Sequence, residues 1–338
     1  MKIHNKKIII TGGAGFIGTN VAKHFQKNNH IIIIDNLFRK GTEKNLKYLK
    51  NNFSIDFKNI DISKENAIND ILHNYPNIDI IFHLASQVAV TSSVIDPQID
   101  FQINALGTFN ILEYARKLKQ KPIVIYSSTN KVYGALKQFD TIEKETRYIF
   151  SDIESIDESC PLDFHSPYGC SKGCGDQYVR DYYRMYDIPG VVFRQSCIYG
   201  DHQYGMEDQG WIAWFLIASL LNKQITVYGN GKQVRDILYV TDIINAYEKA
   251  ILNIDEVKGE IFNIGGGINN SISILEFFNF LKKELNINIQ FEYSNIRPGD
   301  QKIFISNNNK LLNCLGWKPE VGYKLGIKKL YNWIKKIV

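Results

Sequence analysis

Cysteine is scarce in this sequence, and its few copies are widely scattered. The chain has 338 residues but five cysteines, an odd number without a paired spacing. This pattern is not that of a disulfide-stapled secreted protein, and it favours reduced thiols in the cytoplasm. Cys170 and Cys174 lie one helical turn apart, but no second pair and no nearby histidine cluster accompanies them. We therefore predict no metal site.

Long apolar runs and clusters of like charge are also missing. No stretch approaches the length of a membrane span, and the first residues lead into a strand pattern without the marks of a signal peptide. The net charge is +5, and the lysines are spread along the chain rather than gathered in a stripe with aromatic residues. A hydrophobic fraction of 44% with 22% charged residues is typical of a soluble globular protein. The sequence thus predicts a cytoplasmic protein that binds neither membrane nor nucleic acid, with one large or two coupled domains.

Glycine is placed where a dinucleotide-binding fold needs it. Residues 7–11 read as a buried strand and residues 19–28 as a helix, and the turn between them contains Gly12, Gly15 and Gly18. Such a turn brings backbone N–H groups and the positive end of a helix against a pyrophosphate. The residues predicted to bind the phosphates of a dinucleotide are therefore Gly12, Gly15, Phe16, Ile17 and Gly18.

The second predicted strand, residues 31–34, ends at an acidic residue. Asp35 lies at about the distance expected of a carboxylate that accepts hydrogen bonds from an adenosine ribose. A carboxylate there repels a 2′-phosphate, so NAD is favoured over NADP. Arg39 leaves NADP open, because a guanidinium can pair with such a phosphate. Asn36 and Arg39 are counted with Asp35 among the cofactor-binding residues.

Strands and helices go on alternating through the first half of the chain. Short strands are predicted at 53–57, 78–84 and 123–127, and a long helix at 97–119. Alternation of this kind gives a parallel sheet with helices on both faces, which binds ligands at the carboxyl ends of its strands. The further residues predicted to contact the cofactor are Asp61, Ile62, Leu84, Ala85, Gln87, Asn104 and Ser127.

The fold predicted from this pattern is α/β: a Rossmann-type doubly wound parallel sheet with a smaller C-terminal substrate-binding lobe. We place the NAD-binding domain at 1–195 and expect 236–264 to return to it. After residue 195 the alternation of strands and helices breaks. Residues 196–235 and 265–338 are therefore assigned to a lobe that binds a nucleotide sugar.

Tyr168 and Lys172 are four residues apart at the start of a predicted helix. That spacing places them on one helix face, about one turn apart. An ammonium beside a phenol favours the phenolate, and moving the tyrosine pKa from about 10 to about 7 takes about 4 kcal/mol. The product is a base that removes a proton from a sugar or alcohol hydroxyl. A hydroxyl at the end of the 123–127 strand, Thr129, is placed to hydrogen-bond the same substrate oxygen.

With the N-terminal glycines, these residues resemble the extended short-chain dehydrogenase/reductase family, whose members act on nucleotide sugars. The resemblance spans almost the whole chain. It implies that Thr129, Tyr168 and Lys172 are the catalytic triad and that Tyr168 and Lys172 also contact the cofactor, Lys172 through the nicotinamide ribose. It further implies a homodimer or homotetramer, because the helix that carries the tyrosine often pairs with its copy.

The second half of the chain contains candidate substrate contacts. Lys232 and Arg235 follow a glycine-rich turn, and with Arg297 they suit the oxygens of a nucleotide diphosphate. Residues 135–165 form an acidic, irregular insertion, for which a solvated loop capping the site is the favoured interpretation. The complete set of predicted substrate-binding residues is Gln87, Thr129, Asn130, Gln195, Lys232, Arg235 and Arg297.

The reaction is narrowed by the residues that follow Thr129. The dehydratases of the resembled family carry an Asp-Glu pair there, and this chain has Asn130 and Lys131, so dehydration is disfavoured. Five longer strings are similar to the members that invert C2 of a CDP-linked 3,6-dideoxyhexose through a 2-keto intermediate, which implies a CDP-linked or other nucleotide-linked substrate and a place in lipopolysaccharide O-antigen biosynthesis. The strings are DNLFRKG at 35–41, SSTNKVYG at 127–134, DFHSPYGCSKG at 163–173, DQGWIAWF at 208–215 and GNGKQVRD at 229–236.

Two departures from that group keep other activities open. Gln195 stands where the group has a histidine, and Asp201-His202 replaces a Gly-Arg pair. Both are expected near the substrate pocket, so the base and the sugar can differ. A C4-epimerase or a reductase of the same family is the alternative among enzymes, and an NAD-binding sensor is the alternative without catalysis.

Overall fold

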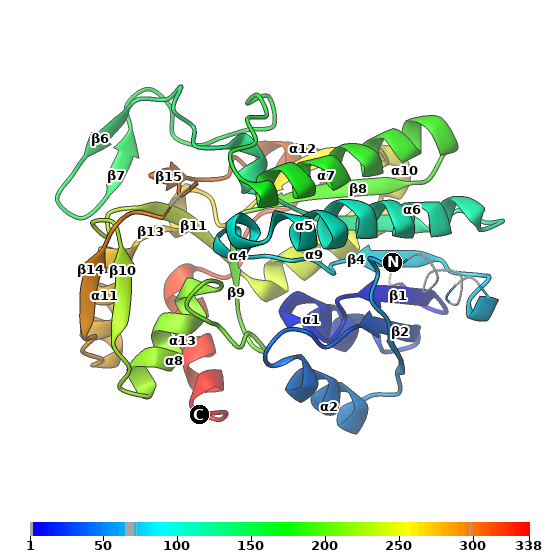
Figure 1. The fold of residues 1–338 in the computed structure, drawn as a ribbon, viewed down its shortest axis with the longest axis horizontal. Coiled ribbons are helices and arrows are strands. Elements are labelled where there is room, and N and C mark those ends of the chain that lie inside the picture. The colour runs from blue at the N-terminus through cyan, green and yellow to red at the C-terminus, as the bar shows by residue number, and fades with distance from the viewer. Residues whose placement is uncertain (1–2, 65–70, 72, 298) are drawn as a thin grey trace.

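A seven-stranded sheet dominates the computed structural model, which describes residues 3–64, 71, 73–297 and 299–338. Each neighbouring pair of strands in it is parallel, in the order β12-β8-β5-β4-β1-β2-β3. The strands are β1 (Lys7–Thr11), β2 (His30–Asp35), β3 (Asp56–Asn59), β4 (Ile80–His83), β5 (Ile123–Thr129), β8 (Gly190–Gln195) and β12 (Ile261–Ile264). The predicted Rossmann-type α/β fold is confirmed (Figure 1).

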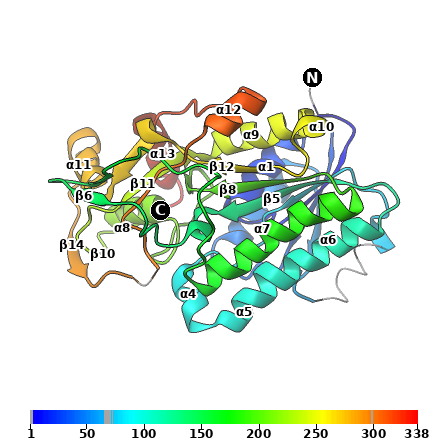
Figure 2. The ribbon, with the colours of Figure 1, turned by 90° about the horizontal axis from the view of Figure 1, so that it is seen from above.

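Both faces of this sheet are buried under helices. Along β1, Ile8 and Ile10 belong to one apolar core and Ile9 to another, because successive side chains of a strand point to opposite faces. Figure 2 shows the two helix layers on either side of the sheet. One layer contains α1 (Phe16–Phe25) and α9 (Val240–Leu252), with α2 (Thr42–Asn52) packed on α1; the other contains α4 (Val90–Ile95), α5 (Pro97–Phe101), α6 (Gly107–Lys117) and α7 (Pro167–Tyr186).

The helix predicted at 97–119 is not continuous. Between α5 and α6, residues Gln102–Leu106 form a π-helical turn, η1, and α6 ends at Lys117. A π turn inserts one extra residue into the hydrogen-bond ladder and re-aims the side chains around it, and such turns are frequent at functional sites. Asn104 lies in this turn. A sequence pattern with a 3.6-residue period does not reveal such an insertion.

The C-terminal lobe contains smaller sheets. Strand β11 (Val234–Tyr239) pairs with β9 (Cys197–Tyr199), β13 (Ser271–Ser273) and β15 (Ile303–Phe304), and β10 (Ile225–Tyr228) pairs with β14 (Phe291–Ser294). Its helices include α8 (Trp211–Leu220), α11 (Ile274–Leu285) and α13 (Tyr323–Ile334).

The pairing of β11 corrects one boundary. Residues 236–239 were predicted to return to the large sheet, but they belong to the smaller one, because β11 is the strand on which β9, β13 and β15 assemble. The chain returns to the large sheet through α9 and β12. The division into two domains otherwise stays a prediction.

The insertion at 135–165 is more ordered than the predicted solvated loop. It contains the hairpin of β6 (Thr141–Glu143) and β7 (Tyr148–Phe150). Leu136, Phe150 and Ile156 are buried in a third apolar cluster together with Phe304 of the lobe. Its acidic residues are consistent with a wet outer face, but its apolar residues attach it to β15. Among the described residues, none of the helices is both long and apolar enough to cross a membrane.

Candidate active site

The glycine-rich turn between β1 and α1 is packed too closely for any larger residue. A Cβ added to Gly12, whose φ is +67°, would lie 2.7 Å from the Ala85 nitrogen, and one added to Gly18 would lie 2.3 Å from the Gly12 oxygen. Helix α1 begins at Phe16, and its N-cap, Gly15, has no side chain to occupy the first N–H groups. These N–H groups and the positive helix end fit a pyrophosphate, as predicted.

Asp35 is held in place at the end of β2. Its carboxylate accepts hydrogen bonds from the Ala14 nitrogen at 3.1 Å and the Leu37 nitrogen at 2.8 Å. Burial raises the pKa of Asp35, and these hydrogen bonds oppose that shift. The carboxylate therefore faces the cavity from a fixed position, which fits the ribose of NAD. Arg39 is more exposed than Asp35, and its Nη2 lies 3.4 Å from the Gln209 Oε1.

Tyr168 and Lys172 share one face of α7, and both line the cavity. The helix begins here because Ser166 accepts a hydrogen bond from the Gly169 nitrogen at 3.0 Å and Pro167 fits the first helical turn. Thr129 ends β5 at the same cavity and makes a hydrogen bond to Tyr168. The three residues predicted as a triad are thus brought together.

The predicted lowering of the Tyr168 pKa is wrong for the protein without ligand. Burial raises the pKa of Tyr168 to about 12, although the Thr129 hydrogen bond and the Arg39 charge act in the other direction. Burial also lowers the pKa of Lys172 to about 7, while the charges of Asp176 and Asp100 oppose the shift. Desolvation of both groups outweighs the attraction that the sequence argument relied on.

Tyr126 is a neighbour of Lys172 that the sequence analysis missed. The Lys172 ammonium lies 4.3 Å from the centre of the Tyr126 ring, and the Tyr126 hydroxyl donates to the Lys172 carbonyl at 3.3 Å. An aromatic face stabilises a buried cation through its quadrupole. The side-chain alternation of β5 is the signal that predicts its position, because it places Tyr126 on the sheet face that α7 covers.

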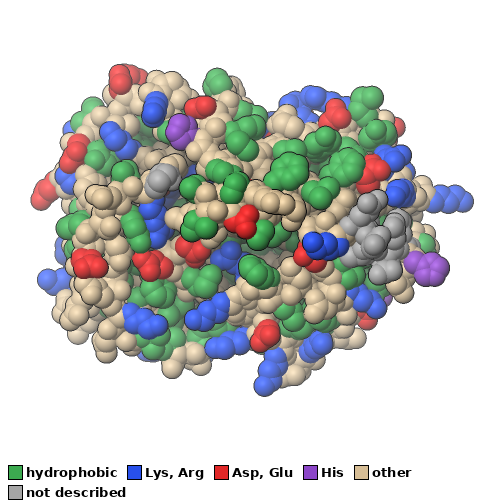
Figure 3. Space-filling model, viewed as in Figure 1, with side chains coloured by type: hydrophobic (Ala, Val, Ile, Leu, Met, Phe, Trp, Pro, Cys, Tyr) green, Lys and Arg blue, Asp and Glu red, His purple; other side chains and the backbone are tan. Residues whose placement is uncertain are grey.

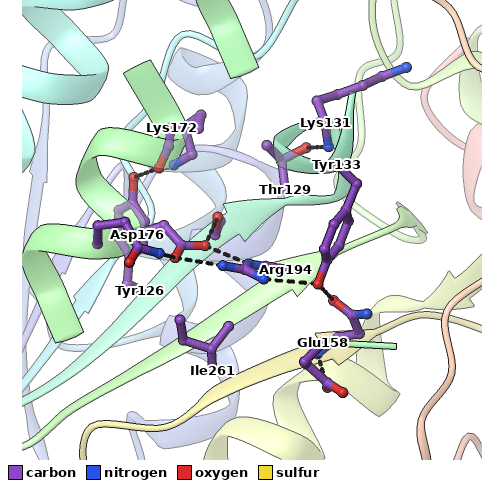
Figure 4. A network of polar contacts seen from close by, with 12 residues as sticks. Tyr126, Thr129, Lys131, Tyr133, Glu158, Lys172, Asp176, Arg194 and Ile261 are labelled. Atoms are coloured by element: carbon purple, nitrogen blue, oxygen red, sulfur yellow. Dashed lines mark hydrogen bonds and ion pairs between the residues drawn. The ribbon is translucent and has the colours of Figure 1, made fainter. Parts of the chain in front are cut away.

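A buried polar network stands behind the triad (Figure 4). Arg194 of β8 pairs with Asp176 of α7, with Nε to Oδ2 at 2.8 Å, and donates to the Tyr133 hydroxyl at 2.9 Å. Ser128 of β5 donates to the same Asp176 carboxylate at 2.9 Å. The network joins β5, β8 and α7, and so fixes the strand end that carries Thr129 against the helix that carries Tyr168.

One large cavity at the carboxyl ends of the strands receives most of the predicted site residues. Figure 3, in the same view as Figure 1, shows charged side chains of both signs around a recess in the middle of the molecule. The predicted residues that line the cavity are Gly12, Gly15, Phe16, Ile17, Gly18, Asp35, Asn36, Arg39, Asp61, Ile62, Leu84, Ala85, Gln87, Ser127, Thr129, Asn130, Tyr168, Lys172, Gln195, Arg235 and Arg297. Lys131, Glu207, Asp208, Trp211 and Asp300 also line it, and the predicted site did not include them.

Asn104 and Lys232 are the predicted site residues that do not line this cavity. The Asn104 amide donates to the Gln87 carbonyl at 3.0 Å and to the Ser171 hydroxyl at 3.2 Å, so it fastens the loop after β4 to α7. Lys232 pairs with Glu143 of the insertion at 2.7 Å. Asn104 therefore has a supporting place behind the cavity wall, and Lys232 links the lobe to the hairpin.

Gln195 reaches the cavity, but its amide group is already engaged. Its Nε2 donates to the Ser127 hydroxyl at 2.8 Å and to the Tyr247 hydroxyl at 2.6 Å. Only its carbonyl oxygen is left to meet a ligand, which differs from the histidine of the group that the sequence resembles.

These features define the class of protein: a dinucleotide-dependent enzyme built on the short-chain dehydrogenase plan, with a second ligand lobe over the same cavity. The chain belongs to the NAD dependent epimerase/dehydratase family, whose model matches residues 8–265. NAD is its cofactor, and the glycine-rich turn and Asp35 fit that group.

Three relatives show how closely the chain follows this family. It is 44% identical to a CDP-paratose 2-epimerase of Salmonella typhi, over 98% of this chain and 100% of the relative. A UDP-glucose 4-epimerase of Thermotoga maritima, solved with UDP-glucose, is 29% identical with a TM-score of 0.85, over 98% of this chain and 99% of that one. A UDP-glucuronic acid 4-epimerase of Bacillus cereus, solved with UDP-glucuronic acid and NAD, is 27% identical with a TM-score of 0.83, over 98% and 100% of the two chains.

Proposed function

We propose that this protein is an isomerase that inverts C2 of a CDP-linked 3,6-dideoxyhexose, the conversion named for CDP-paratose 2-epimerase. The observation that carries the proposal is the full-length identity of 44% to that enzyme, together with a cavity that joins the triad to the arginines of the lobe. The role in lipopolysaccharide O-antigen biosynthesis and the location in the cytoplasm are parts of the same proposal.

The chain's residues divide the work between proton transfer and anchoring. NAD, held by the glycine-rich turn and Asp35, would supply a reversible acceptor for the hydride of the carbinol carbon. Tyr168 takes the proton of the C2 hydroxyl and later gives it back, and Thr129 holds the oxygen in line through its hydroxyl. Lys172 supplies positive charge beside them. Arg235 and Arg297 anchor the diphosphate while the keto sugar turns its other face.

The residues at the end of β5 lack the acid group that dehydration of the sugar would need. Dehydration needs an acid near the sugar, and the residues after Thr129 are the neutral Asn130 and the cationic Lys131. Inversion needs no such acid, because the proton leaves from and returns to the same oxygen.

A homodimer is the assembly that we propose. Helices α4 to α7 leave a row of large apolar side chains exposed, which Figure 3 shows as green patches over α5 and α6. Exposed apolar side chains gathered on neighbouring helices in this way are typical of a subunit interface. Its members are Val94, Ile95, Ile99, Phe101, Leu106, Phe109, Tyr178, Met185 and Tyr186.

The substrate is tested by offering the purified protein CDP-, UDP-, GDP- and dTDP-linked sugars and following the products by NMR. The proposal predicts C2 inversion of a CDP-linked 3,6-dideoxyhexose. Inversion at C4 of a UDP-sugar would instead identify the protein as a 4-epimerase. Such a difference in substrate would arise at Gln195 and Asp201-His202, which depart from the 2-epimerase pattern and lie at or beside the cavity. NAD binding without any conversion would indicate a sensor.

A further inference from the structure

Lys131 lies between the triad and the arginines of the lobe. Its backbone nitrogen donates to the Thr129 hydroxyl at 3.2 Å, and its carbonyl packs so closely on α7 that a Cβ added to Gly169 would lie 2.9 Å from it. The backbone of Lys131 is therefore held against the two elements that carry Thr129 and Tyr168.

The side chain of Lys131 crosses from β5 to the lobe. Its Nζ donates to the Gly299 carbonyl at 3.3 Å and lies 3.6 Å from the Asp300 Oδ1. The side chain is 17% exposed and lines the cavity. An ammonium has three N–H donors; one donates to Gly299, and a second can be directed at Asp300 in the ion pair. A third donor is left for a ligand.

Asp300 joins Lys131 to Arg235. The Arg235 Nη2 lies 2.5 Å from the same Asp300 Oδ1 that faces Lys131. Arg297 is also close enough for its charge to lower the pKa of Asp300, and its guanidinium lies 3.7 Å from the centre of the Tyr228 ring. Glu207, which accepts a hydrogen bond from the Tyr228 hydroxyl at 2.9 Å, is a second carboxylate here. Three cations against two carboxylates leave this part of the cavity with a net positive charge, which favours the negative charges of a nucleotide-linked diphosphate.

The order of these groups separates the two phosphates. Lys131 follows Thr129, which meets the sugar, whereas Arg297 stacks on Tyr228 at the lobe end of the cavity. A diphosphate spanning the cavity therefore presents its sugar-linked phosphate to Lys131. Taking the proposed function as given, we propose that Lys131 binds the sugar-linked phosphate of the substrate and that Asp300 holds Lys131 and Arg235 in position for it.

The protonation of Lys131 gives this contact a pH dependence. Burial and, after it, the Arg235 charge lower the pKa of Lys131 to about 8, although Asp300 and Cys197 act in the opposite direction. These are the charged or titratable groups that face it from β11, from the 299–300 turn and from β9. Lys131 loses its charge as the pH rises through about 8, so the affinity for a diphosphate should fall there.

The test is calorimetric titration of the full-length, NAD-loaded protein with CDP and with CMP, which lacks the sugar-linked phosphate. Lys131→Met should raise the Kd for CDP by about 10-fold or more, the loss of one charge-assisted hydrogen bond, and change the Kd for CMP by less than about 2-fold. Lys131→Arg should retain CDP binding and abolish its weakening above pH 8. Lys302→Met removes an exposed lysine nearby and should change neither Kd.

Two results would overturn the assignment: an unchanged Kd for CDP in Lys131→Met, or equal weakening of CDP and CMP, which would place the effect on the other phosphate or on the lobe itself. NAD content and melting temperature verify that each variant is folded. If the wild-type protein binds CDP in the expected pattern but converts no sugar, the proposed reaction fails while the role of Lys131 stands. If the protein inverts the sugar but Lys131→Met binds CDP as tightly as the wild type, the role of Lys131 fails while the proposed reaction stands.

Discussion

The ammonium of Lys172 lies 4.3 Å from the centre of the Tyr126 ring, at the point where α7 covers β5. A buried ammonium is stabilised by an aromatic face but penalised by lost hydration, and here the penalty wins, since the pKa of Lys172 falls to about 7. Lys172 therefore loses its charge before Tyr168, whose pKa is raised to about 12, can lose its proton.

Lys172 should for this reason cost the NAD-free protein stability. Its pKa is lower in the folded chain than in the unfolded one, so the unfolded chain binds more protons between about pH 7 and the ordinary lysine value near 10.5. The penalty is complete below pH 7 and vanishes as the pH rises through that window. We expect Lys172→Met to raise the melting temperature by at least about 2 °C at pH 7 and by less at pH 10.

Scanning calorimetry at the two pH values tests this. Arg184→Met changes an exposed cation on the same helix and should leave the melting temperature as it is. A Lys172→Met protein that melts lower than wild type at pH 7 would contradict the account.

Tyr168→Phe removes the hydroxyl to which we assign the proton transfer and nothing that we expect to bind the dinucleotide phosphates. Turnover should fall by at least about 10³-fold, because general acid–base catalysis of this kind contributes about 10² to 10⁴. NAD content, measured on the nucleotide released by denaturation, should stay within about 2-fold of wild type. Near-normal turnover would show that Tyr168 does not transfer the proton.

Thr129→Val tests the hydrogen bond that lowers the pKa of Tyr168. Without it the pKa of Tyr168 rises further, so the rise of kcat with pH should move to higher pH. At pH 7.5 we expect kcat to fall about 10- to 100-fold. Thr129→Ser keeps the hydroxyl and should keep the wild-type profile. A profile for Thr129→Val that only scales down, without moving along the pH axis, would argue against the hydrogen bond.

Asp176→Asn tests the network of Figure 4. The substitution leaves the guanidinium of Arg194, a side chain that is 4% exposed, without its counter-ion. Breaking a buried pair in this way costs about 3–5 kcal/mol of unfolding free energy. Urea titration measures the cost, and Asp181→Asn, exposed on the same helix, is the control. Equal unfolding midpoints for the two variants would show that the pair adds little.

The sequence predicted the parts of the site that depend on backbone geometry. Gly12 and Gly18 were found by their spacing between a predicted strand and helix, and the structure leaves no room there for a Cβ. Tyr168 was found because the i, i+4 spacing of a helix is fixed. The triad residues come from two elements, and the parallel alternation of strands and helices was enough to bring them to one edge.

The parts that the sequence did not predict depend on contacts between distant segments. Lys131 meets Asp300 across 169 positions, from 131 to 300, and no local pattern encodes that pair. Asn104 was placed on a regular helix, but it lies in a π turn and does not line the cavity. The prediction for the pKa of Tyr168 failed for a related reason. Burial is set by the whole fold, and its effect on this pKa outweighs the charge of the single neighbour Lys172.

The most direct test of the central claim follows the C2 proton during inversion of a CDP-linked 3,6-dideoxyhexose by the NAD-loaded protein in deuterated water. Internal return of hydride predicts that the inverted sugar keeps its C2 proton, with NMR couplings of the new configuration and no deuterium at C2. Deuterium entering at C2 would show that the carbon is deprotonated instead, and would contradict the account.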